Sequence, residues 1–236
     1  TLAEALGITC TEDIGLMSIE YTCYDGENGF TQSLCLTNTG VNTLKLNRLE
    51  HFIRNFEKEG KHMSGEQLHT FLDNIEKTHG LYSPPALGLA AAIACCGFTF
   101  LLGGGPIEMF CAFVGAGIGN YLRCKLTKYH FTLFLCIVSS VSLACFAYAG
   151  MLKLGEILFG ISVQHEAGYI CAMLFIIPGF PFITSGIDLA KLDMRSGMER
   201  LMYALIVILV ATMSAWIMAL ILHLKPVNFM KLSLTM

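Results

Sequence analysis

Residues 201–224 read LMYALIVILVATMSAWIMALILHL, and this stretch decides the class of fold. Apart from His223 it holds no residue that ionises near neutral pH. A helix of ~20 apolar residues is long enough to cross the hydrocarbon core of a bilayer. The sequence therefore predicts a transmembrane helix over residues 201–224.

Four earlier stretches have the same apolar character. They predict further spans near residues 86–103, 107–122, 129–150 and 167–188, which makes five in all. The second is short, begins with Glu108 and is rich in glycine. We expect its Gly115, Gly117 and Gly119 to let neighbouring helices pack closely.

Charge separates a polar head from this apolar body. Residues 1–83 carry 12 acidic and 6 basic side chains, whereas residues 84–236 carry 6 acidic and 9 basic ones. The whole chain is 54% hydrophobic and only 14% charged, against the ~25% charged share of soluble domains. We expect an α-helical polytopic membrane protein, residues 84–236, preceded by a small cytoplasmic α+β domain, residues 1–83.

The head shows two kinds of periodicity. Alternating apolar and polar residues over 17–23 and 30–37, joined by the glycine-containing turn 25–29, predict a β-hairpin. Apolar residues at helical spacing over 46–56 predict an amphipathic helix, and Ser64 with Gln67 forms a capping box before a second one. A further helix is expected to end near Gly7.

Basic residues between the spans predict the orientation. With the head in the cytoplasm, the inner loops after spans two and four hold six Lys or Arg residues, and the opposite side holds three. This agrees with the positive-inside rule. It places the N-terminus in the cytoplasm and the C-terminus outside. The inner residues are Arg123, Lys125, Lys128, Lys191, Arg195 and Arg200; the outer ones are Lys153, Lys225 and Lys231.

The fourth span contains the most informative motif. Pro178, Gly179 and Pro181 interrupt it, and in lipid a broken helix is tolerated where it packs on protein or lines a cavity. Transporters use such breaks to bind substrate near the midplane, although a plain proline kink that shapes packing is the alternative. The candidate substrate-binding or gating residues are Pro178, Gly179, Pro181, Thr184, Ser185, Gly186 and Asp188.

Acidic residues near the spans have two interpretations each. Asp188 is either an acid inside the membrane, hence functional, or the first polar residue of the next loop beside Lys191. Glu108 is either part of a polar pathway or a carboxylate that complements a helix N-terminus. Asn120 and Asp193 are further candidates for a coupling or polar pathway.

Other chemistry is not indicated. The ten cysteines include no C-x-x-C and no zinc-ligand spacing, and the histidines show none either, so we expect no metal and no cofactor. The spans hold no paired acids and no H-E-x-x-H, which argues against an enzyme. A net charge of −3 without a Lys/Arg cluster argues against a nucleic-acid partner.

The order of parts resembles the threonine/serine exporter family, known as ThrE. The resemblance rests on Gly40-Val41-Asn42 and the helices after it, on the run Phe98–Gly104, and above all on residues 177–189, IPGFPFITSGIDL, with Asp193 and Gly197 downstream. It implies a multi-pass protein of the bacterial cytoplasmic (inner) membrane that exports a small polar metabolite with ion coupling.

The resemblance also implies a partner. Full-length members have about ten spans in two halves, so five spans imply the N-terminal half of a split system with a second small membrane subunit and assembly as a homo- or hetero-oligomer. The expected substrate is a threonine- or serine-type amino acid. A dicarboxylate such as succinate, or a purely accessory, scaffolding role, is the alternative.

Overall fold

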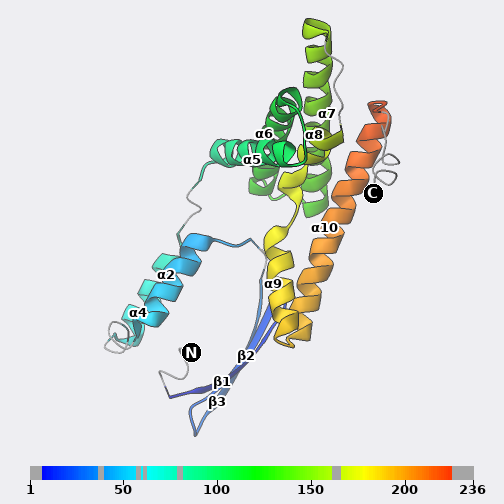
Figure 1. Ribbon diagram of the computed structural model, residues 1–236. Coiled ribbons are helices and arrows are strands. Elements are labelled where there is room, and N and C mark those ends of the chain that lie inside the picture. Colours follow the sequence, from blue (N-terminus) through cyan, green and yellow to red (C-terminus); the bar gives the residue numbers. More distant parts are fainter. Residues whose placement is uncertain are drawn as a thin grey trace. The chain divides into compact units, whose positions relative to one another are not determined.

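The computed structural model describes residues 7–36, 40–56, 60, 63–78, 82–160 and 166–224. Contacts divide the chain into two compact units, one of Thr1–Leu81 with Ser185–Arg200 and one of Tyr82–Thr184 with Leu201–Met236. The turn between the last two helices therefore belongs to the same unit as the polar head. Figure 1 gives the order of the elements.

The first unit contains a three-stranded antiparallel sheet in the order β1-β2-β3. Its strands are β1 (Thr9–Ile14), β2 (Ser18–Tyr24) and β3 (Gly29–Cys35). The predicted hairpin is confirmed, with Tyr24 opposite Gly29. Its turn is closed by the Asp25 carboxylate, which accepts hydrogen bonds from the amides of Glu27 at 3.0 Å and Asn28 at 2.7 Å.

Strand β1 was not foreseen. Its sequence, TCTEDI, is mostly polar and its residues are exposed except for the half-buried Ile14. A strand without a buried face lacks the period-2 hydrophobic signal. The helix expected to end near Gly7 falls on residues 1–6, which lie outside the described residues.

Two amphipathic helices follow the sheet, as predicted. Helix α2 (Thr43–Arg54) begins at Asn42, whose side chain accepts from two backbone amides of the first turn. Helix α4 (Gly65–Glu76) begins with the expected reciprocal capping box of Ser64 and Gln67. Both caps satisfy amides that have no partner inside the helix.

The second unit is built from apolar helices. They are α5 (Pro84–Leu101), α6 (Pro106–Lys128), α7 (Leu133–Phe159), α8 (Glu166–Cys171) with the 3-10 turn η1 (Leu174–Ile176), α9 (Gly179–Ala190) and α10 (Met194–Ile221). Helices α9 and α10 extend into the first unit at Ser185–Arg200. Among the described residues, α5, α7 and α10 are long and apolar enough to cross a membrane. The bent pair α8–α9 makes four if it counts as one span.

Helix α6 explains why five spans are not confirmed. It is continuous where the second span was predicted, but it also includes Glu108, Arg123, Lys125 and Lys128, which lower its apolar character. It packs against both α5 and α7 (Figure 1). Most of the basic residues expected in the inner loops lie in helices instead, since α6 runs to Lys128 and α10 starts before Arg195; Lys191 lies in the turn between α9 and α10.

The glycines of α6 confirm the predicted close packing. A Cβ on Gly117 would lie 3.2 Å from the Ala92 Cβ of α5. A Cβ on Gly119 would lie 2.8 Å from the Ala144 Cβ of α7. Small residues on both sides of α6 thus bring three helix backbones together, as in many membrane bundles.

Candidate functional site

The predicted helix break is present between α8 and α9. Helix α8 ends at Cys171, η1 makes one tight turn, and α9 begins at Gly179, with an angle of 67° between the two halves. Pro178 lies at the break, and its carbonyl accepts the amide of Phe182 at 3.2 Å. Proline has no amide proton and clashes with the preceding turn, so the helix cannot continue through it.

Steric contacts do not require glycine at either Gly179 or Gly186 of the motif. A Cβ on Gly179 or on Gly186 would meet no atom within 4 Å, and neither residue has a positive φ angle. The bend therefore follows from Pro178 rather than from glycine strain. Pro181, in the first turn of α9, is at a position where helices tolerate proline.

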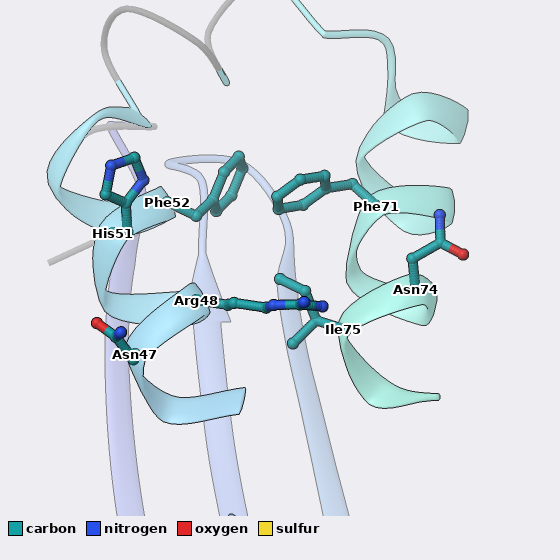
Figure 2. A pocket seen from close by; sticks show the side chains of 7 residues that line it. All are labelled: Asn47, Arg48, His51, Phe52, Phe71, Asn74 and Ile75. Carbon is teal, nitrogen blue, oxygen red and sulfur yellow. The ribbon is translucent and has the colours of Figure 1, made fainter. Parts of the chain in front are cut away.

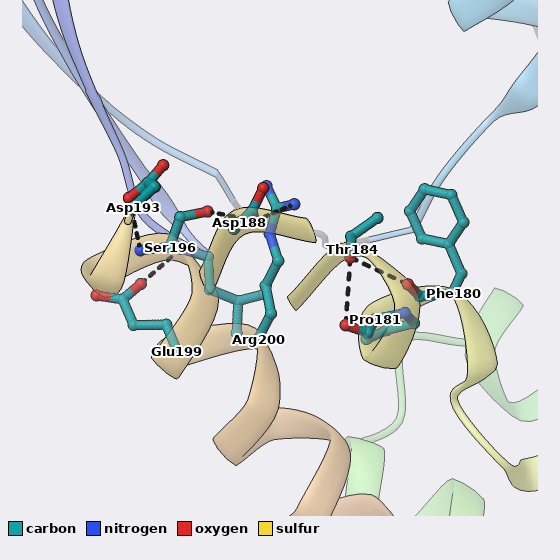
Figure 3. A network of polar contacts seen from close by, with 9 residues as sticks. Phe180, Pro181, Thr184, Asp188, Asp193, Ser196, Glu199 and Arg200 are labelled. Atoms are coloured by element: carbon teal, nitrogen blue, oxygen red, sulfur yellow. Dashed lines mark hydrogen bonds and ion pairs between the residues drawn. The ribbon is translucent and has the colours of Figure 1, made fainter. Parts of the chain in front are cut away.

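Of the two hydroxyl residues of α9, Thr184 bonds to its own helix and Ser185 is buried. The Thr184 hydroxyl donates to the carbonyls of Phe180 at 3.0 Å and Pro181 at 3.2 Å, so it satisfies its own helix (Figure 3). Ser185 is buried, with 1% of its surface exposed.

Asp188 is held in a polar network at the turn between α9 and α10. Its Oδ2 accepts from the Ser196 hydroxyl at 3.0 Å and lies 2.9 Å from the Arg200 guanidinium (Figure 3). The charged partner of Asp188 is Arg200, and both sequence interpretations of Asp188, as an acid inside the membrane or as the first polar residue of the loop, stay predictions. The charge is matched, which leaves little reason for it to take up a substrate ammonium.

Asp193 caps a helix. Its Oδ1 accepts from the backbone amide of Ser196 at 3.3 Å, in the first turn of α10. Its own amide donates to the carbonyl of Asp188 at 3.0 Å. The first bond is typical of an N-cap residue. The second connects Asp193 to Asp188 across the turn between α9 and α10.

The β1–β2 turn docks on the start of α10. The amide of Leu16 donates to Glu199 Oε2 at 2.6 Å, and Asp13 pairs with Arg195. A Cβ on Gly15 would lie 2.8 Å from the same Glu199 oxygen, so the turn fits closely. All these residues belong to the first unit.

Glu108 differs from these acids because it is buried and no basic side chain of the described residues pairs with it. Only 5% of its surface is exposed. Its Oε2 accepts from the Gly105 amide at 2.9 Å, which caps α6 as one of the two sequence interpretations expected. Among the described residues no Lys, Arg or His pairs with it, and Oε1 has no hydrogen-bond donor.

Glu108 packs against the first half of the broken helix. A Cβ on Gly168 of α8 would lie 3.0 Å from the Glu108 Cβ and 2.5 Å from the hydroxyl of Tyr148. On the other side, a Cβ on Gly104 would lie 3.0 Å from Glu108 Oε2 and 2.5 Å from the Thr99 Cγ2. Close glycine contacts thus bring the Glu108 and Tyr148 side chains together at Gly168 of α8, and the Glu108 carboxyl and the Thr99 methyl together at Gly104.

Two further side chains tie α6 to its neighbours. The Arg123 guanidinium donates to the Phe175 carbonyl at 3.1 Å, in the turn just before the break. The Asn120 amide donates to the Leu87 carbonyl of α5 at 2.8 Å. Arg123, predicted as a topology anchor, therefore stabilises the broken segment, and Asn120 is a link between helices.

The predicted site residues thus divide into two groups. Glu108 and Asn120 lie in the second unit, where Glu108 touches the broken helix; Asp188 and Asp193 lie in the first. The sequence missed Tyr148 and Gly168, which an apolar helix pattern does not distinguish from packing residues. Within the described residues, no group of three or more His, Cys, Asp or Glu side chains could hold a metal ion.

Among the described residues, three helices that are long and apolar enough to cross a membrane, with a bent pair that could form a fourth span, indicate an integral membrane protein. The family model described as "putative threonine/serine exporter" (ThrE) matches residues 1–222, so the chain belongs to the threonine/serine exporter family. The family makes the chain a membrane transport protein with a lipid bilayer around it and a small molecule as substrate. Comparisons with curated proteins and with solved structures found no match.

Proposed function

We propose that this chain exports threonine- or serine-type amino acids in exchange for protons, and that the proton and the substrate's ammonium alternate at Glu108. The observation that carries the proposal is the burial of Glu108, 5% exposed and without a cationic partner among the described residues. The acid at the α9–α10 turn, Asp188, already pairs with Arg200.

The exchange follows from electrostatics. An ionised carboxylate away from water is costly unless a cation accompanies it, so in the proposed cycle either a proton or a substrate ammonium accompanies Glu108. The α-ammonium of an amino acid can supply that cation and displace the proton. When the amino acid leaves on the outer side, a proton must return to Glu108, and the two fluxes are thereby opposed.

The broken helix supplies polar groups at the end of α6 opposite Glu108, since Phe175 contacts Arg123 near the other end of that helix. At ~1.5 Å per residue the two ends are about 20 Å apart, so one amino acid does not reach Glu108 and the start of α9 at the same time. The Phe180 amide has no backbone acceptor among the described residues. Helix N-termini bind carboxylates, and the carboxylate of an amino acid would bind there at a separate step of its passage along the broken helix. The Phe175 carbonyl, in contrast, is already bound by Arg123 and stabilises the break. Alternating access then moves α8 and α9 around the bound substrate.

The proposal keeps five spans, with α6 as the second. At ~1.5 Å per residue its 23 residues are long enough; Glu108 is buried, and the exposed Lys125 and Lys128 lie in the last turn of the helix. It also keeps the cytoplasmic head of residues 1–83, the transmembrane domain of 84–236, a bacterial inner membrane, an N-terminus inside and a C-terminus outside. The positive-inside rule supports this orientation, although Lys225 and Lys231 lie outside the described residues.

The alternative substrate and the accessory role can be distinguished from amino-acid export by what each would require of Glu108. A dicarboxylate such as succinate has no ammonium, so it gains nothing from an ionised Glu108. A purely accessory subunit would need no buried acid against its broken helix. The second small membrane subunit and the homo- or hetero-oligomer also stay proposals, and co-purification of the chain with its partner tests them.

The test is efflux from proteoliposomes that hold the purified chain, alone or with the second subunit. Vesicles are loaded with threonine, serine or succinate, and a proton gradient, acid outside, is imposed. The wild type should release threonine or serine faster with the gradient, and Glu108→Gln should release neither. Glu156→Gln, which changes an exposed acid of α7, is the matched control and should behave as wild type.

Two outcomes would overturn the proposal. Gradient-driven threonine efflux by Glu108→Gln at the wild-type rate would remove Glu108 from the mechanism. Succinate efflux without threonine or serine efflux would replace the amino acid by the dicarboxylate. Correct folding of each variant is checked by its elution in size-exclusion chromatography.

A further inference from the structure

A cavity of about 510 Å³ lies between α2 and α4 in the polar head. Its apolar part consists of Phe52, Phe71 and Ile75. The two rings face each other from the two helices, with centroids 4.6 Å apart (Figure 2). Phe52 and Ile75 are buried at 3% and 5% exposure. The volume lies within the ~300–1,000 Å³ range of small-molecule pockets.

The polar part of the cavity contains donors and no acid. It is lined by Asn47, Arg48, His51 and Asn74. This is unexpected in a head where residues 1–83 carry twice as many acidic as basic side chains. The cavity is therefore a local exception to the charge of the domain around it, and it favours an anion.

Arg48 is positioned for this task. Its Nη1 donates to the Thr78 hydroxyl at 3.1 Å, and that hydroxyl donates to the Asn74 carbonyl at 3.1 Å. Among the described residues no carboxylate pairs with Arg48, so most of its five N–H donors are available. In Figure 2 its side chain extends from α2 toward Ile75 of α4.

We propose that this cavity is a binding site for a small organic anion, a carboxylate carried on an aromatic or branched apolar body. Arg48 would bind the carboxylate through paired N–H donors, which suit its planar geometry. The Phe52 and Phe71 rings, which pack on each other, would form the apolar wall against which the body of the ligand lies. His51 and the two asparagine amides complete the polar side.

The ligand differs in chemistry from the transported amino acid. No acid lines the cavity to bind an α-ammonium, and the cavity belongs to the first unit whereas Glu108 belongs to the second. The inference therefore stands independently of the proposed transport mechanism. Its test uses binding and not transport.

The experiment follows a fluorinated probe by ¹⁹F NMR, with the full chain in nanodiscs of neutral lipid. The probe is 4-fluorobenzoate, and its uncharged counterpart 4-fluorobenzamide has the same shape. The wild type should bind 4-fluorobenzoate saturably and the amide much more weakly. Arg48→Gln should weaken binding of the carboxylate about tenfold or more, as expected for loss of a charged hydrogen-bond donor.

Matched variants separate a binding role from a general loss of charge. Arg54→Gln removes a guanidinium from the same helix that pairs with Glu50 outside the cavity, and it should leave binding unchanged. His51→Gln, at an exposed position, should weaken binding of the carboxylate without affecting the fold. Circular dichroism confirms that each variant is folded.

Three results would overturn the proposal. These are the absence of saturable binding of 4-fluorobenzoate to the folded wild type, equal affinity for carboxylate and amide, and equal affinity of the folded Arg48→Gln and Arg54→Gln variants. None of them bears on Glu108 or on amino-acid efflux, so failure here is distinct from failure of the proposed function.

Discussion

Asp188 and Arg200 form an ion pair at 2.9 Å that joins the end of α9 to the start of α10. Both side chains are mostly buried, with 19% and 27% of their surfaces exposed. The Ser196 hydroxyl bonds to the same carboxylate oxygen. The acid of the Pro-Gly motif is thus paired, and the proposed transport chemistry is assigned to Glu108 instead.

Breaking this pair should destabilise the protein. Asp188→Asn or Arg200→Gln leaves a partly buried charge unmatched and should cost about 1.5–3 kcal/mol, the range for hydrogen bonds to charged groups. The apparent melting temperature in detergent, followed by size-exclusion chromatography after heating, measures the loss. The exchanged pair Asp188→Arg with Arg200→Asp should recover part of it. Single variants as stable as wild type would show that the pair contributes nothing.

Arg123 should prove necessary for the broken helix. Arg123→Leu leaves the Phe175 carbonyl without its donor in an apolar surrounding, and amino-acid efflux from proteoliposomes should fall strongly. Arg123→Lys, which can still donate, should retain part of the activity. Lys125→Leu changes a neighbouring cation whose ammonium lies over the Tyr121 ring and serves as control. An equal loss of efflux in Arg123→Leu and Lys125→Leu would indicate that Arg123 acts through the membrane orientation of the chain and not through its bond to Phe175.

Glycine substitutions should differ sharply along the chain. Gly168→Ala forces a methyl to within 2.5 Å of the Tyr148 hydroxyl, so it should cost about 1–3 kcal/mol and reduce efflux. Gly179→Ala and Gly186→Ala meet no atom within 4 Å and should be tolerated. Thermal stability and efflux of the three variants are compared side by side. If Gly179→Ala were as stable as the wild type but inactive in efflux, the break would need glycine in a second conformation of the transport cycle, and the expected tolerance would be wrong.

The register of β1 and β2 can be tested with cysteines. Cys10 lies opposite Cys23, with the two Sγ atoms 3.2 Å apart, and a mild oxidant such as diamide should join them in a disulfide. Their hydrogen bond raises the pKa of the Cys10 thiol above its usual value. Since the thiolate is the reactive form, oxidation should accelerate as the solution becomes more alkaline. Peptide mass spectrometry detects the link, and Cys35, opposite Ser18, is the internal control. A Cys35 link to either residue would contradict the register.

The sequence predicted those parts of the fold that carry a local signal. Alternation predicted β2 and β3, the Ser64 and Gln67 pair predicted the cap of α4, and Pro178 predicted the break. Strand β1 was not predicted because it carries mostly polar residues on both faces. The second span was predicted over residues 107–122, and α6 continues to Lys128, because a helix does not have to end where basic side chains begin.

The site was harder to predict because its properties depend on distant residues. Spacing identified Glu108 and Asp188 equally well as acids near spans. Only the fold reveals that Arg200 neutralises one and that Gly104 and Gly168 enclose the other. Arg48 and His51, one helical turn apart, look like a solvated helix face until α4 places Phe71 and Asn74 opposite them.

The most direct test of the central claim is proton release on substrate binding. Threonine is added to the purified protein in weakly buffered detergent solution, and the pH change is followed with an indicator dye. If the ammonium displaces a proton from Glu108, the wild type releases about one proton per bound threonine, binding tightens as the pH rises, and Glu108→Gln releases none. Threonine binding by the wild type without proton release, or with the same release in Glu108→Gln, would contradict the account.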